Sequence, residues 1–199
     1  MGIFRSWASI ALACACLVAH AKVEITTNLK DGDKIAGEVL VRVTVKTDDL
    51  VSGVEFTVGD ELRSTDDSTP YEMRIDTVAE KEGALKLKIG AFTTNGQRAE
   101  TTLNLVVDNE LGKGPEHHVG LGNGSLSNSK FDEAIIHGRV ALKAKSDFLP
   151  AKLLLARANF GKGILDSAEK FCGDVLTAEP NNLDALDLQA AIQLSKAFR

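Results

Sequence analysis

The chain has 199 residues, of which 44% are hydrophobic, and its formal net charge at neutral pH is −5. This length accommodates one large or two small domains, each with its own core. The negative charge is concentrated between residues 22 and 112, where 18 acidic residues outnumber 11 basic ones, whereas residues 113–199 are nearly neutral. An acidic first half repels nucleic acid and anionic lipid, so we expect neither as a partner.

Residues 1–21 have the pattern of a secretory signal peptide. Arg5 precedes an apolar run over residues 10–19, and residues 19–21 read Ala-His-Ala, which is typical of a cleavage site. The run is shorter than the ~20 residues that span a bilayer. We therefore expect cleavage after Ala21, no membrane span in the mature chain, and a periplasmic, extracellular or cell-surface location.

The three cysteines leave two alternatives to simple cleavage. Cys14 and Cys16 lie within the apolar run, so a lipid anchor on one of them stays open, as does a retained N-terminal membrane anchor. Cleavage leaves only Cys172, so the mature chain forms no internal disulfide although it is exported. Its stability must then come from packing.

Between residues 22 and 108, hydrophobic and polar residues alternate with a period of two, which predicts half-buried β-strands. The clearest strand covers residues 38–46, where four valines share one face. Similar sets lie at residues 54–58, 71–75, 85–91 and 103–107, and Val23 and Ile25 begin the sheet. Turn signals separate them, including Asn95-Gly96 and a Ser-Thr-Asp-rich loop that ends at Pro70. This spacing predicts an antiparallel β-sandwich.

Short motifs in this region resemble the bacterial immunoglobulin-like modules of secreted and surface proteins. The motifs are the strand Val54 to Val58, the loop from Ser64 to Glu72 with its Pro70-Tyr71 pair, Asp76-Thr77, and Ala91-Phe92 followed by Asn95-Gly96. The resemblance implies an Ig-like domain over residues 22–108 that acts as a spacer or an adhesive surface.

Residues 109–115 form a polar, glycine-bearing linker that ends at Pro115. Beyond it the hydrophobic period becomes 3.6, which predicts amphipathic helices, with Cys172 on a buried face. The pattern then repeats at a fixed interval: Leu121 recurs as Leu155, Gly122 as Ala156 and Ala190, and Ala134 as Ala168. A fixed period of this length, about 34 residues, predicts stacked helix-turn-helix units.

In this register the residues resemble the tetratricopeptide repeat. The resemblance implies two units and a capping helix over residues 116–199, with small residues where paired helices touch. The aromatic positions of the family are occupied here by His118, Ser125, Lys152 and Asn159. Two extra glycines, Gly120 and Gly124, cost the first helix about 2 kcal/mol. We therefore expect this helix to fray or to rest on the sandwich.

In the repeat family the first helix of each unit lines a concave face that binds partners. The residues at those positions are Val119, Asn123, Leu126, Leu153, Arg157, Phe160, Asp187, Ala191 and Leu194. We expect a mixed apolar groove centred on Leu153, Arg157 and Phe160, with Asn123 beside it, that binds another envelope protein or a peptide. The alternative is that these residues pack on the β-domain or on a second copy, which leaves a homodimer open.

No pattern in the chain predicts catalysis, a cofactor or a metal site. The glycine-rich run at residues 120–125 lacks the Lys-Ser/Thr of a phosphate-binding loop, and no G-x-S-x-G motif occurs. His117, His118 and His137 lack further ligands at suitable spacing, so we expect the adjacent pair to be exposed or hydrogen-bonded. Loop acids that offer oxygen ligands to calcium are more often turn formers. These acids are Asp48, Asp49, Asp60, Asp66 and Asp67.

Two functions from different classes fit the sequence. The first is an exported, non-enzymatic scaffold of the bacterial cell envelope that binds a partner through the helical repeats. The second is a carbohydrate-binding or adhesive surface protein that acts through the Ig-like domain. Sugar sites usually stack the ring on exposed aromatic residues, whereas Phe56, Tyr71 and Phe92 are predicted in the core or at a strand end. This favours the first function.

Overall fold

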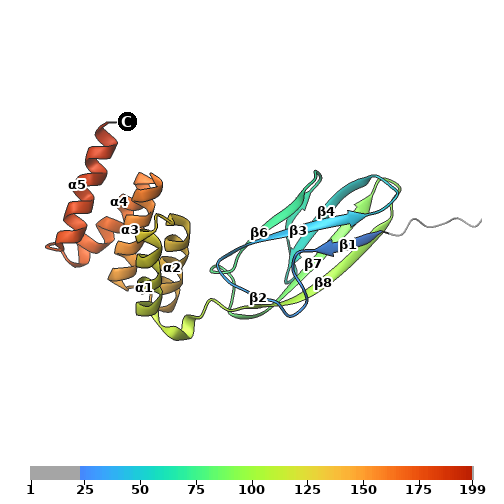
Figure 1. The fold of residues 1–199 in the computed structure, drawn as a ribbon, viewed down its shortest axis with the longest axis horizontal. Helices are drawn as coiled ribbons and strands as arrows, with labels where there is room; N and C mark the ends of the chain where they lie inside the picture. The colour runs from blue at the N-terminus through green and yellow to red at the C-terminus, as the bar shows by residue number, and fades with distance from the viewer. Residues whose placement is uncertain (1–22, 199) are drawn as a thin grey trace, which may run out of the picture.

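The computed structural model describes residues 23–198, so the predicted signal peptide, with Cys14 and Cys16, lies outside the described residues. Figure 1 shows a β-sandwich followed by an array of five helices, and the two parts lie end to end. The predicted order of an all-β part and an all-α part is confirmed. No helix among residues 23–198 is long and apolar enough to cross a bilayer.

The sandwich consists of two sheets. The first has the order β1-β3-β6 and contains β1 (Glu24–Thr27), β3 (Glu38–Lys46) and β6 (Tyr71–Asp76). The second has the order β2-β8-β7-β4-β5 and contains β2 (Lys34–Ile35), β4 (Val51–Val58), β5 (Glu61–Asp66), β7 (Gly83–Thr93) and β8 (Arg98–Val107). Neighbouring strands are antiparallel, except that β2 runs parallel to β8.

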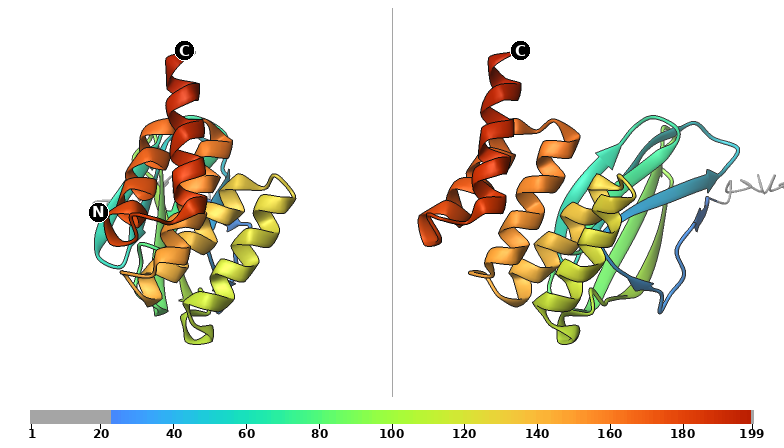
Figure 2. Two further views of the ribbon diagram at one scale, coloured as in Figure 1. Left: turned by 90° about the vertical axis from the view of Figure 1, so that its left-hand side faces the viewer. Right: turned by 60° about the vertical axis from the view of Figure 1, so that its left-hand side comes forward.

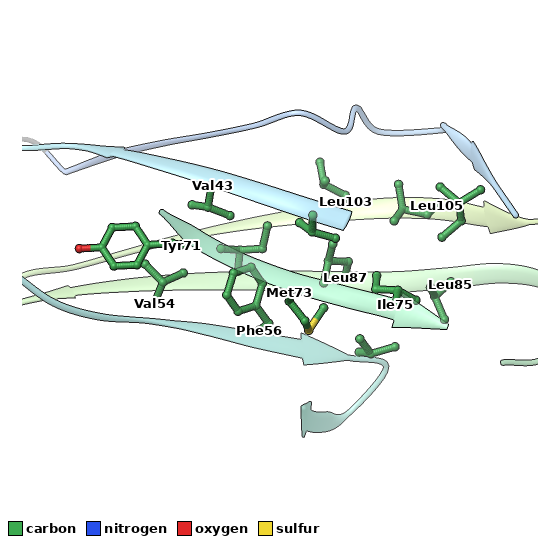
Figure 3. Close-up of a cluster of buried hydrophobic side chains, with 14 of the residues drawn as sticks. Val43, Val54, Phe56, Tyr71, Met73, Ile75, Leu85, Leu87, Leu103 and Leu105 are labelled. Atoms are coloured by element: carbon green, nitrogen blue, oxygen red, sulfur yellow. The ribbon is translucent and has the colours of Figure 1, made fainter. Parts of the chain in front are cut away.

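The core of the sandwich is formed by alternate residues of both sheets. Figure 3 shows Phe56, Met73, Leu87 and Leu105 pointing into the space between the sheets. Phe56, Leu87 and Leu105 are completely buried. Burial of such side chains stabilises the fold by roughly 25 cal/mol per Å² of apolar surface removed from water.

Strand β5 corrects one expectation. Residues 64–66 were predicted to begin a Ser-Thr-Asp-rich loop, but they belong to β5, which pairs with β4 and forms the edge of the second sheet. Their side chains are exposed or half-buried on both faces, so the segment lacks the alternation that identifies a strand. Polar edge strands also resist pairing with the edges of other molecules.

The helical array begins after a short connection that contains a 3-10 turn, η1 (Leu111–Lys113). Its helices are α1 (Pro115–Ser127), α2 (Phe131–Ala144), α3 (Leu149–Lys162), α4 (Leu165–Ala178) and α5 (Leu183–Ala197). Helices α1, α3 and α5 begin at residues 115, 149 and 183, and α2 and α4 begin at residues 131 and 165. Corresponding helices therefore follow one another at the interval of the sequence repeat.

Small residues lie where the helices touch. Ala134, Ala156 and Ala168 are completely buried. A Cβ atom added to Gly122 would clash with the side chain of Leu154, so this glycine is required for the close contact between α1 and α3. Gly120 has open space around it, as has Gly124. α1 is a continuous helix of 13 residues.

Candidate functional site

The centre of the predicted groove lies on α3, at its contact with α5. Leu153 and Phe160 are half-buried and pack against a cluster of residues from α3, α4 and α5. Between them along α3, Arg157 pairs with Asp184 of α5, with an Nη2–Oδ1 distance of 3.1 Å. Exposed ion pairs of this kind contribute about 0–1 kcal/mol. Asp184 therefore holds Arg157 only weakly.

The other predicted groove residues lie on α1 and α5. Val119 and Leu126 of α1 pack against a separate cluster that includes Leu154 and Ala158. Asn123 is exposed on α1. Asp187 and Leu194 of α5 are exposed, and Ala191 is half-buried. The structure thus places Leu153, Arg157 and Phe160 on one helix, α3, and Asn123 on α1 as an exposed residue.

A second candidate site is the junction between the sandwich and the array, which the sequence did not reveal. Helix α2 contacts the loops at this end of the sandwich: Arg139 forms an ion pair with Asp76, and Lys143 Nζ donates a hydrogen bond to the carbonyl oxygen of Glu80. Ile136 lies over Gly37, where an added Cβ would be 3.2 Å from Ile136 Cγ2. The helix that rests on the sandwich is therefore α2.

Asn109 connects three segments at this junction. Its side-chain oxygen accepts hydrogen bonds from the backbone N–H of Gly37, at 3.0 Å, and from Thr77 Oγ1, at 2.8 Å. Its Nδ2 donates to the carbonyl oxygen of Thr77, at 3.1 Å, and to Glu82 Oε1, at 2.8 Å. Asn109 and Thr77 are both buried. The network fixes the point at which the chain leaves the sandwich.

A cavity of about 400 Å³ lies between this network and α2. Its sandwich side is formed by residues 34–37 and 108–110, and its helical side by His118, Ile136, His137 and Val140. This size falls at the lower end of the range for small-molecule sites. The wall is mainly apolar, with the two histidine rings on the helical side.

Of the three neighbouring histidine rings, His118 and His137 line this cavity, and His117 lies next to His118. The ring centroids of His117 and His118 are 5.3 Å apart, and those of His118 and His137 are 6.1 Å apart. His118 is only 3% exposed. Its Nε2 lies 3.1 Å from the carbonyl oxygen of Glu110, which can only accept, so Nε2 carries a hydrogen.

The expected hydrogen bonding of the pair is present only in part, at Nε2 of His118. Nδ1 of His118 and Nε2 of His117 are buried, and neither has a hydrogen-bond partner among the described residues. Within residues 23–198, no group of three or more His, Cys, Asp or Glu side chains is arranged to hold a metal ion.

The family match to known proteins lies in the first part of the chain. Residues 22–89 match the family described as bacterial Ig domain. The N-terminal part is a bacterial Ig-like domain. Its first sheet and most of its second lie within the match, and β8 completes the second sheet.

Two solved structures are similar to this part of the chain. The fibronectin(III)-like modules of Clostridium thermocellum CbhA are 31% identical, over 42% of this chain and 94% of theirs, with a TM-score of 0.38. CopC from Methylosinus trichosporium OB3b is 15% identical, over 44% of this chain and 93% of its own, with a TM-score of 0.31. No curated protein matches the chain significantly.

The polar loops of the bacterial Ig-like domain use their acids to shape turns. Asp66 accepts hydrogen bonds from the backbone N–H groups of Glu72, at 2.9 Å, and Ser68, at 3.2 Å. These bonds, that of Glu72 first, lower the pKa of the Asp66 carboxyl. Asp49 accepts from Asn95 Nδ2 at 2.8 Å. Both contacts are typical of turn-forming acids.

Acidification is expected to destabilise the junction through His137. Burial, followed by the nearby charge of His118, lowers the pKa of His137 below its ordinary value of 6.5. The native state therefore binds this proton less readily than the unfolded state, so the stabilising effect is present above pH 6.5 and is lost as the pH falls through the lowered pKa. We expect the thermal midpoint of the parent to fall more between pH 7 and pH 5 than that of His137→Gln. Parallel pH profiles of the two proteins, measured by circular dichroism, would contradict this.

Proposed function

We propose that the chain is an exported, non-enzymatic interaction protein of the bacterial cell envelope. In this proposal the bacterial Ig-like domain carries a short array of tetratricopeptide-like repeats, and the array binds another envelope protein or a peptide. Bacterial Ig domains are typical of extracellular and surface proteins, which agrees with the secretory pattern of residues 1–21. The proposed location is the periplasm or the cell surface.

The spacing of the helices is the observation that carries the repeat assignment. The odd-numbered helices begin at residues 115, 149 and 183, an interval that matches the tetratricopeptide period of about 34 residues. The small residues of that register, Ala134 and Ala168 among them, are buried at helix contacts. The positions of the family's aromatic residues are also inside the array, where His118, Ser125 and Asn159 are buried.

The proposed binding surface is centred on Leu153, Arg157 and Phe160. The half-buried apolar side chains offer contact area, and Arg157 offers a cation whose present partner, Asp184, is itself exposed. Such a surface suits a segment that presents an apolar residue next to an acidic one. We include Asn123 in the proposed surface as an exposed hydrogen-bonding group on α1.

The adhesive or carbohydrate-binding alternative has less support. Phe56 and Tyr71 are buried in the core of the bacterial Ig-like domain. The remaining aromatic ring of that domain, Phe92, is covered by the guanidinium of Arg98, whose Cζ lies 4.9 Å from the ring centroid. A sugar ring that stacks on an aromatic face would have to displace this cation.

The surface can be tested by affinity purification from envelope extract with cross-linking. Arg157→Glu and Phe160→Ala are each expected to reduce recovery of the bound protein about tenfold, because a central charged or aromatic anchor contributes more than about 1 kcal/mol. Arg42→Glu, which breaks an ion pair in the bacterial Ig-like domain, is the matched control and is expected to leave recovery unchanged.

Thermal melting of each variant separates loss of binding from loss of folding, since Phe160 also packs in the array. Equal recovery by the parent and by a folded Arg157→Glu chain would remove the proposed surface.

A further inference from the structure

The cavity at the junction has the size and the apolar wall of a small-molecule site. Ile35 of the sandwich lies on one side of it, and Ile136 and Val140 of α2 lie on the other. Ile35 and Val140 are themselves buried. An apolar cavity of about 150 Å³ holds benzene, so the volume of about 400 Å³ found here accommodates a molecule with two fused rings. Ligand sites typically combine such a wall with a small number of polar groups.

The helical side of the cavity carries polar groups that have no hydrogen-bond partner. His137 is half-buried and forms no hydrogen bond with any other described residue, and both of its ring nitrogens remain accessible. On the neighbouring ring, Nδ1 of His118 is buried without a partner. Native proteins pair nearly all of their buried polar groups, so an unpartnered one indicates a missing contact. The two imidazoles therefore form the polar part of the site.

The charged groups around the cavity are already paired. Lys34 Nζ lies 3.0 Å from Asp108 Oδ2, and Lys113 Nζ lies 2.8 Å from Glu110 Oε1. Burial lowers the pKa of His137, so this imidazole is neutral at pH 7. A carboxylate or phosphate in the cavity would lie near the carboxylates of Asp108 and Glu110, and like charges repel. The lining therefore favours a neutral ligand.

We propose that the junction cavity binds a neutral small molecule that has an apolar ring system and one hydroxyl group. The rings fill the apolar space between the sandwich and α2, and the hydroxyl is hydrogen-bonded to His137. A neutral imidazole has one N–H donor and one acceptor nitrogen, and a hydroxyl can pair with either of them. The site is independent of the proposed surface on α3, because Leu153, Arg157 and Phe160 do not line the cavity.

The ligand contacts both parts of the chain at once. One wall of the cavity belongs to residues 34–37 and 108–110, and the other belongs to α1 and α2. A molecule that binds between them binds only when α2 rests on the sandwich, so it stabilises this arrangement by mass action. We therefore expect the site to be lost whenever the two parts separate.

The experiment is a titration of the purified chain with 2-naphthol at pH 7, followed by NMR of the backbone amides. We expect saturable shifts at Gly37 and Asn109 on the sandwich side and at His137 on the helical side, with a dissociation constant of about 0.1–1 mM for a probe of this size. 2-Naphthoate, which has the same rings and a carboxylate, is expected to bind about tenfold more weakly or less. The proposal is overturned by a lack of saturable shifts at the cavity, by shifts confined to another part of the chain, or by equal binding of 2-naphthoate.

Three variants test the position and the hydrogen bond. Ala36 lines the cavity and is exposed, so Ala36→Phe is expected to fill part of the space and abolish binding while the chain stays folded. His137→Phe keeps a flat ring but cannot form the hydrogen bond, so we expect binding to weaken about fivefold to tenfold. His117→Phe is the matched control, because His117 does not line the cavity, and it is expected to bind as the parent does.

Melting followed by circular dichroism shows that each variant is folded at the temperature of the titration. Binding by Ala36→Phe that equals binding by the parent overturns the proposed position. An equal loss of affinity in His117→Phe and His137→Phe overturns the proposed hydrogen bond, because only one of these rings lines the cavity.

Discussion

Ala168→Leu is expected to unfold the helical array while the bacterial Ig-like domain remains folded. Ala168 is completely buried in the cluster between α3, α4 and α5, where three added carbon atoms have no space. Overpacking of this kind typically costs about 1–3 kcal/mol. An array of five helices has little stability to spare, because repeat arrays need about three units. We therefore expect the destabilisation to be about as large as the whole free energy of unfolding of the array.

Thermal melting followed by circular dichroism at a helical wavelength measures this effect. The matched control is Ala178→Leu, because Ala178 belongs to the same helix but is exposed. We expect the helical transition of Ala168→Leu to be absent at room temperature or shifted down by about 10 °C or more, in line with roughly 4–8 °C per kcal/mol for a small domain. A helical transition equal to that of Ala178→Leu would contradict the assignment of Ala168 to a close helix contact.

Asn109→Ala is expected to have the second-largest effect, and it acts on the bacterial Ig-like domain. Removing the amide leaves the buried N–H of Gly37 and the hydroxyl of Thr77 each without one of its partners. An unsatisfied buried polar group costs about 1–3 kcal/mol, so we expect a total loss of about 3 kcal/mol. Chemical unfolding with urea, followed by circular dichroism in the β region, gives the free energy of unfolding.

Asn104→Ala provides the comparison for this variant. Asn104 Nδ2 also makes a side-chain hydrogen bond, to Asp31 Oδ1 at 3.0 Å, but the pair is exposed. Water replaces that bond after the substitution, so we expect a loss below about 1 kcal/mol. Equal losses for Asn104→Ala and Asn109→Ala would show that the network at the junction adds nothing to the stability of the domain.

The parts of the fold that were predicted correctly are those in which hydrophobic residues recur with the period of a strand or a helix. The strand expected at residues 38–46 coincides with β3, because one of its faces is buried and the sequence alternates accordingly. The helices were predicted because their buried residues recur with the helical period. Strand β5 was missed because its side chains are polar and exposed on both sides, so its place at the sheet edge comes from the backbone pairing with β4.

The junction could not be predicted, because its contacts join residues far apart in the sequence. Arg139 and Asp76 are separated by 63 positions, and Asn109 and Gly37 by 72. Neither pair belongs to a periodic pattern. The burial of His118 had a signal, since it occupies an aromatic position of the repeat, but the stacking of His118 on His137 depends on the packing of α1 against α2.

The end-to-end arrangement of the two parts sets the distance between the start of β1 and the helical array. β1 begins at the end of the bacterial Ig-like domain that is farthest from the helices (Figure 1), and the right-hand view of Figure 2 shows the same order. β8 spans the length of the domain with ten residues, which corresponds to ~33 Å at about 3.3 Å per residue. Anything joined to the chain before β1 is thus held about 30 Å from α2. The contacts of Arg139 and Lys143 with the sandwich act against bending at the connection.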